Sequence, residues 1–218
     1  MSDYVVDFSK DIESERVDSI SFGPLSKKLE DRSKDISTLL SVEDIKDIPF
    51  PKNSSEEVLE ELNTIRLVQQ TSPEWHQGDY KNKIDKNFLS IYTDYLDEFK
   101  LDYNIEYIKN VLEDINPFIL KIKKKYNRPR PAQLSKYHEV NILTDETSTA
   151  KSPAYPSGHS FQAKVIETIL TKEHPDHKNI FTSITDRVSL ARILRGLHFP
   201  SDIRFSYFIV NNYLVNKI

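Results

Sequence analysis

The chain has 218 residues, 38% of them hydrophobic, which is long enough to bury the core of one domain. No run of about 18 apolar residues occurs, so the sequence predicts no integral membrane association. Cysteine is absent, which excludes disulfides and thiolate metal sites, and the net charge of -4 argues against a nucleic-acid partner. The first residues lack the basic-then-apolar layout of a secretory signal, and we expect a soluble, cytoplasmic protein.

The first 46 residues are rich in Asp, Glu, Ser and Lys and have little periodicity. They predict an N-terminal arm (1–46) of uncertain order, extended or with a marginal helix around 25–40, ahead of one domain at 47–218. The domain opens with a Pro-containing approach and a helix that Ser54 or Ser55 can cap. Three leucines begin the apolar face of that helix: Leu59, Leu62 and Leu67.

Two segments, 87–99 and 104–115, show the 3.6-residue spacing of amphipathic helices. Pro117 is expected to start or kink a further helical turn that runs to Tyr126. Residues 127–156 contain several prolines and no sustained period, and loops of that length inside a compact domain are usually functional or disordered. The clearer apolar stripe of the two segments consists of Ile105, Ile108, Val111, Leu112 and Ile115.

Three more helices are expected after this loop, at about 157–172, 177–197 and 200–215. Strand-like alternation is nowhere convincing, and no internal repeat occurs. The sequence therefore predicts an all-α fold, a single-domain helical bundle.

A basic cluster, "KIKKKYNRPRP", occupies residues 121–131. Lysines near a helix C-terminus favour its negative pole, so a solvated helix end is the plainest interpretation. A short nucleic-acid patch and an anion site are the alternatives. The anion site gains support because Lys123 continues the stripe of Ile115 and Ile119 towards the interior.

A second cluster is "PSGH", where Ser157 can cap a helix whose buried face carries Phe161. Gly158 leaves the first turn open, and free backbone N–H groups at such an end can hold an anion. His159 would then lie beside that anion. The alternative is an ordinary capped helix with a surface histidine.

A third cluster, "SLARILRGLHFPSD", places Arg192 one turn after Val188, on a face that is predicted to be buried. A buried arginine requires a partner, either a carboxylate or a bound phosphate. His198 precedes Pro200, which suits the first position of a helix, and Asp202 is close enough to accept a hydrogen bond from the histidine ring. An Asp that fixes the imidazole tautomer makes a histidine a directed base or nucleophile.

The order of these motifs resembles the type 2 phosphatidic acid phosphatase superfamily, which includes bacterial class A acid phosphatases and vanadium haloperoxidases. The similarity spans about residues 123–203. The matching residues are Lys123, Arg130 and Pro131, then Pro156, Ser157, Gly158 and His159, then Arg192, His198 and Asp202.

Two departures from that pattern matter. Ala191 stands where the family usually has Ser, so one hydrogen bond is expected to be missing. The first motif also fits a second register, Lys121 with Arg128. We prefer Lys123 with Arg130, because "KKKYNRPRP" is then similar to the class A layout, and Arg128 becomes a supporting residue.

The resemblance implies a phosphatase that needs no metal and no cofactor and acts on a small-molecule phosphate ester. His198, oriented by Asp202, would attack phosphorus, and His159 would protonate the leaving alcohol and then activate water. The phosphate would be bound by Lys123, Arg130, Ser157, Gly158 and Arg192.

Two alternative functions remain from the sequence. One is a vanadium haloperoxidase, in which vanadate would be the cofactor and not an inhibitor; the other is a catalytically silent phosphate- or nucleotide-binding module. Residues 132–155 are expected to form the pocket rim, and the sequence is compatible with a homo-oligomer. The other histidines are expected on the surface or in loops, with His138 the candidate for lining the pocket: His76, His138, His174 and His177.

Overall fold

A computed structural model describes residues 8–72, 84–145, 147 and 150–218, and these residues form helices and no strands. The predicted all-α fold class is therefore confirmed. The helices are α1 (Phe8–Asp18), α2 (Lys27–Arg32), α3 (Glu56–Thr71), α5 (Leu89–Glu98), α6 (Ile105–Tyr126), α7 (Pro131–Leu134), α8 (Gly158–Glu173), α9 (Lys178–Leu194) and α10 (Pro200–Ile209), with short turns at Pro175–His177 and Val210–Leu214.

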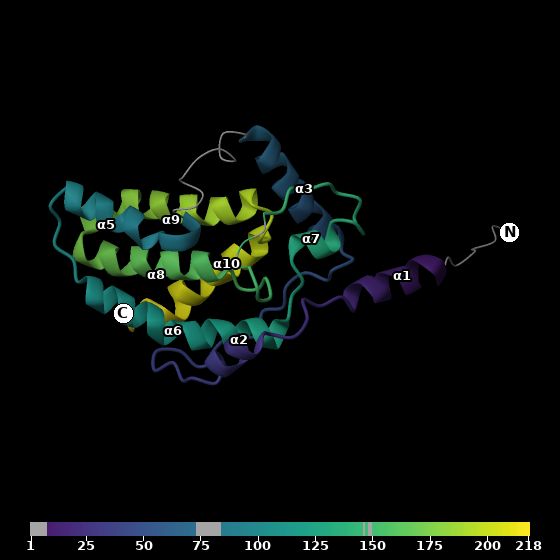
Figure 1. Ribbon diagram of the computed structural model, residues 1–218, viewed down its shortest axis with the longest axis horizontal. Coiled ribbons are helices and arrows are strands. Elements are labelled where there is room, and N and C mark those ends of the chain that lie inside the picture. Colours follow the sequence, from purple (N-terminus) through teal and green to yellow (C-terminus); the bar gives the residue numbers. More distant parts are fainter. Residues whose placement is uncertain (1–7, 73–83, 146, 148–149) are drawn as a thin grey trace.

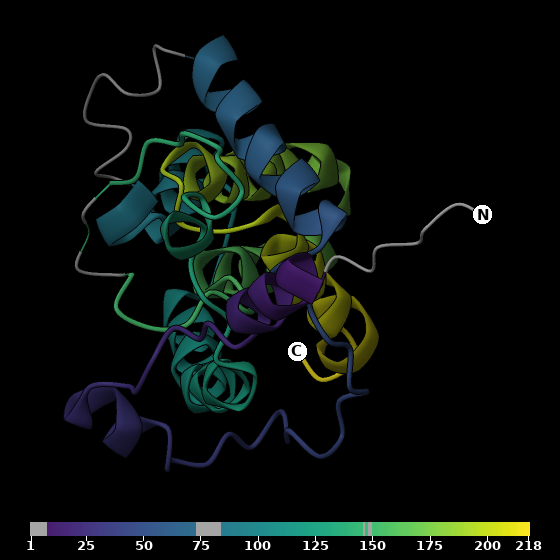
Figure 2. The same cartoon turned by 90° about the vertical axis from the view of Figure 1, so that its right-hand side faces the viewer.

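Helix α8 is the centre of the bundle and packs against α9, α10 and α6 (Figure 1). Its apolar residues, among them Phe161, Val165 and Ile169, are buried in the main core together with Phe118 of α6 and Phe181 of α9. Helix α3 crosses the end of the bundle near α7 (Figures 1 and 2). This packing gathers the C-terminus of α6 and the N-termini of α8 and α10 at one end of the bundle.

The buried face of α3 differs from the predicted one. Leu62 is buried, but Leu67 is 59% exposed, and the buried positions are instead Val58, Glu61, Leu62, Ile65 and Gln69. Spacings of three and four residues keep side chains on one face of a helix. Leu67 comes five residues after Leu62, and this spacing places its side chain away from the buried face. The cap was predicted correctly, since the Ser55 side chain accepts from the Val58 N–H.

The later helices follow their sequence patterns closely. Helix α6 runs unbroken through Pro117, so this proline starts no new helix, and buried residues include Ile108, Val111 and Ile115. Helix α9 ends at Leu194, before the predicted residue 197, and α10 gives way at Val210 to a π-helical turn that reaches Leu214.

The N-terminal arm packs against the helical bundle. Val17 of α1 is buried with α3, and the Asn53 side-chain amide donates to the backbone oxygens of Val17 and Ile20. Further along, the Phe22 N–H donates to the Asn127 backbone oxygen at the end of α6. The division at residue 46 stays a prediction. Across the described ranges, the helices include none with the length and apolarity to cross a bilayer.

Candidate active site

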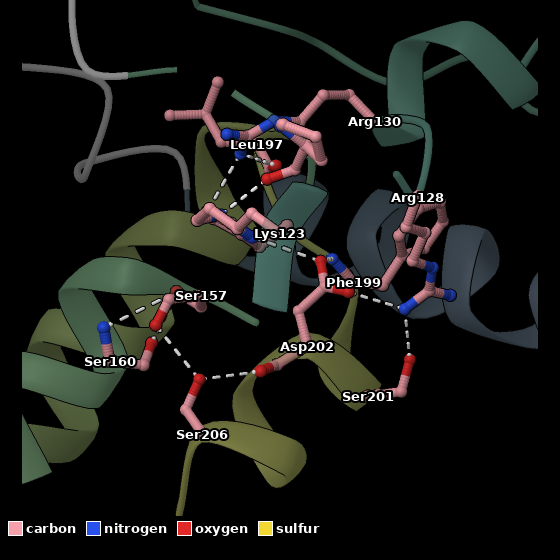
Figure 3. A network of polar contacts seen from close by, with 12 residues as sticks. Lys123, Arg128, Arg130, Ser157, Ser160, Leu197, Phe199, Ser201, Asp202 and Ser206 are labelled. Atoms are coloured by element: carbon pink, nitrogen blue, oxygen red, sulfur yellow. Dashed lines mark hydrogen bonds and ion pairs between the residues drawn. The ribbon is translucent and has the colours of Figure 1, made fainter. Parts of the chain in front are cut away.

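Lys123 lies on the last turns of α6 and is 4% exposed, as the apolar stripe of that helix predicts. Its Nζ donates a 2.5 Å hydrogen bond to the Pro153 backbone oxygen (Figure 3). Burial, together with the nearby charge of Arg130, lowers the pKa of Lys123 well below its ordinary value. An anion beside this ammonium would raise the pKa of Lys123 again, so the buried positive charges favour the binding of an anion.

Arg130 follows α6 and is the N-cap residue of the short helix α7, and its guanidinium lies against the edge of the His198 ring, at Nε2. Nε and Nη2 both donate to the Ser152 backbone oxygen, at 3.0 and 2.6 Å. Nη1 donates to the Leu197 oxygen at 2.7 Å and lies 2.9 Å from His198 Nε2. Burial lowers the pKa of Arg130 to about 9, which leaves it charged at neutral pH.

His198 is 2% exposed, and its two partners fix its tautomer. Nδ1 lies 3.1 Å from Asp202 Oδ2, and a carboxylate can only accept, so Nδ1 carries the proton. Arg130 can only donate, so Nε2 keeps its lone pair. Burial, with the charges of Arg130 and Lys123, holds the pKa of His198 well below its ordinary value. The result is a neutral imidazole with an unprotonated Nε2.

Ser157 is fully buried and caps α8 as the sequence predicts. Its hydroxyl accepts weakly from the Ser160 N–H at 3.5 Å and shares a 2.9 Å bond with the Ser160 hydroxyl. The Ser157 N–H donates to the backbone oxygen of Asp202. The Ser206 hydroxyl lies within donating distance of the backbone oxygens of both Ser157 and Asp202 (Figure 3). Ser157 thus ties the starts of α8 and α10 together.

Gly158 and His159 form the first turn of α8. A Cβ added to Gly158 would lie 4.0 Å from Ile119 Cγ2 and from Lys123 Cε, so glycine leaves space open next to the lysine head. His159 Nε2 donates to the Asp85 backbone oxygen at 3.2 Å, since a carbonyl can only accept. Burial and the charge of Arg192 lower the pKa of His159 to about 3, so the ring is neutral at neutral pH.

Arg192 is buried on the face of α9 where Phe181, Ile184 and Val188 are also buried, as expected. Of its two expected kinds of partner, the structure shows a carboxylate: Nη1 donates to Asp85 Oδ1 at 2.6 Å. Asp85 also pairs with Arg195 at 3.1 Å. Burial lowers the pKa of Arg192, and the positive charge of Arg192 in turn helps to lower the pKa of His159 and of His198.

Arg128 and Glu61 form a buried layer behind Asp202 that the sequence did not reveal in full. Arg128, 0% exposed, donates to Asp202 Oδ1 at 2.5 Å and to Glu61 Oε2 at 3.0 Å, and it stacks over Phe199 at 4.1 Å. Glu61 also accepts from the N–H and hydroxyl of Ser201. Arg128 was predicted as a supporting residue, but no local pattern identifies Glu61, which lies on α3.

A pocket of about 160 Å³ opens at this end of the bundle. Of the eight predicted site residues, Lys123, Arg130, Gly158, His159 and His198 line it directly. The other three lie around it: Asp202 behind His198, Ser157 beneath the start of α8, and Arg192 against Asp85. Its remaining lining residues are Leu29, Arg32, Asn116, Ile119, Leu120, Ser152 and Gln162.

The residues of the two registers of the first motif lie in different places. Lys123 and Arg130 line the pocket, whereas Lys121 is half-buried outside its lining and Arg128 faces two carboxylates. Ala191, the departure in the third motif, is buried in an apolar cluster with Ala163 and Val188.

The remaining histidines have partners away from this pocket. His138 Nε2 donates to the Asn53 backbone oxygen, and His174 Nε2 donates to the Asp102 backbone oxygen, both at 2.6 Å. His177 Nδ1 shares a 2.7 Å hydrogen bond with the Tyr95 hydroxyl. His76 lies outside the described residues. Residues 144–151 include several that line a neighbouring pocket of about 520 Å³, which Arg130 also lines. Within the described chain, no three His, Asp or Glu residues gather where they could hold a metal ion.

Comparison with known protein families gives a match that fits this geometry. The model of the PAP2 superfamily matches residues 108–210, and that segment contains every residue of the three motifs. No curated protein sequence matches the chain. Residues 108–210 thus match the PAP2 superfamily, and this match implies phosphatase-type chemistry in general, the hydrolysis of phosphoric esters.

Proposed function

We propose that the protein is a metal-independent phosphomonoesterase of the acid-phosphatase type, which hydrolyses small soluble phosphate esters through a phosphohistidine. One observation carries the proposal: the neutral His198 ring donates to Asp202 through Nδ1 and directs its unprotonated Nε2 towards a pocket lined by Lys123, Arg130 and His159. A module that only binds phosphate has no need of a nucleophile oriented in this way.

In the first step, His198 Nε2 attacks phosphorus, the N–P bond forms and the bond from phosphorus to the alcohol oxygen breaks. Lys123, Arg130 and Arg192 stabilise the charge on the phosphoryl oxygens, and the Gly158 N–H at the start of α8 adds a donor. Asp202 accepts from the Nδ1–H and stabilises the positive charge that develops on the ring. Arg130 Nη1 donates to His198 Nε2 in the structure, so this donor has to turn to a phosphoryl oxygen before Nε2 can attack.

His159 handles the protons. As a cation it gives a proton to the departing alcohol oxygen, and as the neutral base it then takes one from the water that attacks phosphorus and breaks the N–P bond. His159 Nε2 donates to the backbone oxygen of Asp85, which leaves Nδ1 to give and take these protons. The alcohol and inorganic phosphate leave, and both histidines return to their initial state.

The electrostatics favour activity on the acid side of neutrality. Burial and the charge of Arg192 lower the pKa of His159 to about 3, and the negative charge of a bound phosphoryl group would raise that pKa. Lower pH then increases the cationic form of His159 that the first step needs. His198 stays neutral under the same conditions, because its pKa is held well below the ordinary value.

The test is hydrolysis of p-nitrophenyl phosphate in EDTA, compared with bromination in the presence of vanadate and peroxide. The proposal expects hydrolysis in EDTA, competitive inhibition by vanadate and no bromination. Activity that vanishes in EDTA and returns only with a divalent metal contradicts metal independence. Bromination without hydrolysis would identify the haloperoxidase instead, and phosphate binding with neither activity would identify a binding module.

A further inference from the structure

Two residues of the N-terminal arm, Leu29 and Arg32 on α2, line the same pocket as His198. The arm is fixed to α6 on both sides of α2. Before it, the Gly23 N–H donates to Asn127 Oδ1 at 3.2 Å; after it, the Thr38 N–H donates to Asp114 Oδ2 at 2.9 Å. Figure 1 shows α2 alongside α6. The arm therefore forms one wall of the proposed active site.

The pocket is polarised from its base to its mouth. Lys123, Arg130 and His198 are buried at the base, whereas Arg32 is exposed at the mouth. Between them, the half-buried amides of Asn116 and Gln162 are linked by a 2.9 Å hydrogen bond from Gln162 Nε2 to Asn116 Oδ1. Apolar contacts come from Leu29, Ile119 and Leu120. The base suits the phosphoryl group, and the mouth is left for the alcohol part of the ester.

The mouth carries one positive charge more than the phosphoryl group requires. None of the described residues that line the pocket is acidic, and the Arg32 side chain makes no ion pair or hydrogen bond with any described residue. Lys123 and Arg130, with the field of Arg192, already neutralise a phosphate dianion at the base. An unpaired guanidinium at the mouth is suited to a second anion, since carboxylates and phosphates match its fork of donors.

We infer that Arg32 selects phosphate monoesters whose alcohol carries a second anionic group, a carboxylate or another phosphate. The inference rests on the proposed function, whose reaction fixes which end of the pocket holds the phosphoryl group. The pocket volume of about 160 Å³ keeps such substrates small, because drug-sized ligands fill roughly 300–1,000 Å³. Leu29 and the amide pair would contact the carbon skeleton and hydroxyl groups between the two anions.

The experiment compares 3-phosphoglycerate with glycerol 3-phosphate, two primary phosphate esters that differ by a carboxylate in place of a hydroxymethyl group. Glycerol 1,3-bisphosphate, which has a phosphate on the terminal hydroxyl of glycerol 3-phosphate, tests a second phosphate in the same way. For Arg32→Ala, kcat/KM for the doubly anionic esters should fall about three- to tenfold more than for glycerol 3-phosphate, the effect of one exposed charge-assisted contact. Lys28→Ala, an exposed lysine of the same helix outside the pocket lining, is the matched control.

A binding measurement separates failure of this inference from failure of the proposed reaction. In the His198→Ala background, titration calorimetry should show that Arg32→Ala weakens the binding of 3-phosphoglycerate more than the binding of glycerol 3-phosphate. Equal effects of Arg32→Ala on both esters, or the same selective loss in Lys28→Ala, overturn the inference. If wild-type protein hydrolyses no ester but the calorimetric difference is found, the reaction is wrong and the second-anion site stands.

Discussion

Arg128 Nη1 donates a 2.5 Å hydrogen bond to Asp202 Oδ1, while the other oxygen of that carboxylate accepts from His198. The Arg128 guanidinium is itself held by Glu61 of α3 and by the face of Phe199. The orientation of the proposed nucleophile therefore depends on a buried chain of charges that begins on a distant helix. Removing one member of such a chain leaves its neighbour buried without compensation, which is strongly destabilising.

Glu61→Gln tests this chain while keeping the size of the side chain. The neutral amide no longer balances Arg128, so we expect the free energy of unfolding to fall by about 3 kcal/mol. Because Asp202 is then less firmly placed, kcat should fall while KM changes little. Denaturant unfolding and steady-state kinetics measure both effects. Glu60→Gln, an exposed position on the same helix, is the control, and indistinguishable behaviour of the two variants contradicts the account.

Gly158→Ala and Gly196→Ala should fail in different ways. At Gly158 the new Cβ meets Ile119 and Lys123 at 4.0 Å, an ordinary contact, so the fold should survive while the methyl group narrows the pocket and raises KM. At Gly196, φ is +62° and the new Cβ would lie 2.2 Å from the Leu143 oxygen, so stability should fall. Thermal unfolding and KM for p-nitrophenyl phosphate distinguish them. A destabilised Gly158→Ala with unchanged KM would show that this glycine serves only the fold.

Lys123→Ala and Lys121→Ala form a matched pair for the first motif. Lys123 is buried in the pocket lining and Lys121 is half-buried outside it. Loss of a donor aimed at transition-state charge costs about 10²–10³-fold in rate, so kcat/KM should fall by that order for Lys123→Ala and by far less for Lys121→Ala. The reverse order would mean that the alternative register, Lys121 with Arg128, is the correct one.

The lowered pKa of His159 should make the protein less stable in acid. The unfolded chain takes up this proton below about pH 6.5, whereas the folded chain does so only near pH 3, so the free energy of unfolding decreases as pH falls between these values. At pH 5 the loss from this residue is about 2 kcal/mol relative to pH 7. His159→Gln should remove that share of the loss. Denaturant unfolding of both proteins at the two pH values checks this, and equal losses contradict the assignment.

Local patterns predicted the helices well. Ser157 caps α8 because its side chain can reach the first N–H groups, and the burial of Arg192 follows from its spacing to Val188. The prediction that Leu67 lies on the buried face of α3 was wrong. Several faces of one helix can carry apolar residues, and tertiary packing decides which of them is buried.

Partners that are distant in the chain were beyond the sequence. Asp85 holds Arg192 from 107 positions away, and Glu61 holds Arg128 from 67 positions away. No periodicity records such pairs, since each depends on how whole helices pack. The place of Arg32 at the pocket was hidden for the same reason, because its arm has little periodicity and contacts α6 through scattered polar groups.

The most direct test of the central claim is to trap the phosphohistidine. His159→Ala should still accept a phosphoryl group from p-nitrophenyl phosphate, since nitrophenolate leaves without a proton, but it should release phosphate slowly because the base is missing. We expect a burst of nitrophenolate close to the enzyme concentration. Alkaline quenching, digestion and mass spectrometry should then find one phosphoryl group on the peptide that contains His198. A burst from His198→Ala, or a phosphoryl group on any other residue, would contradict the account.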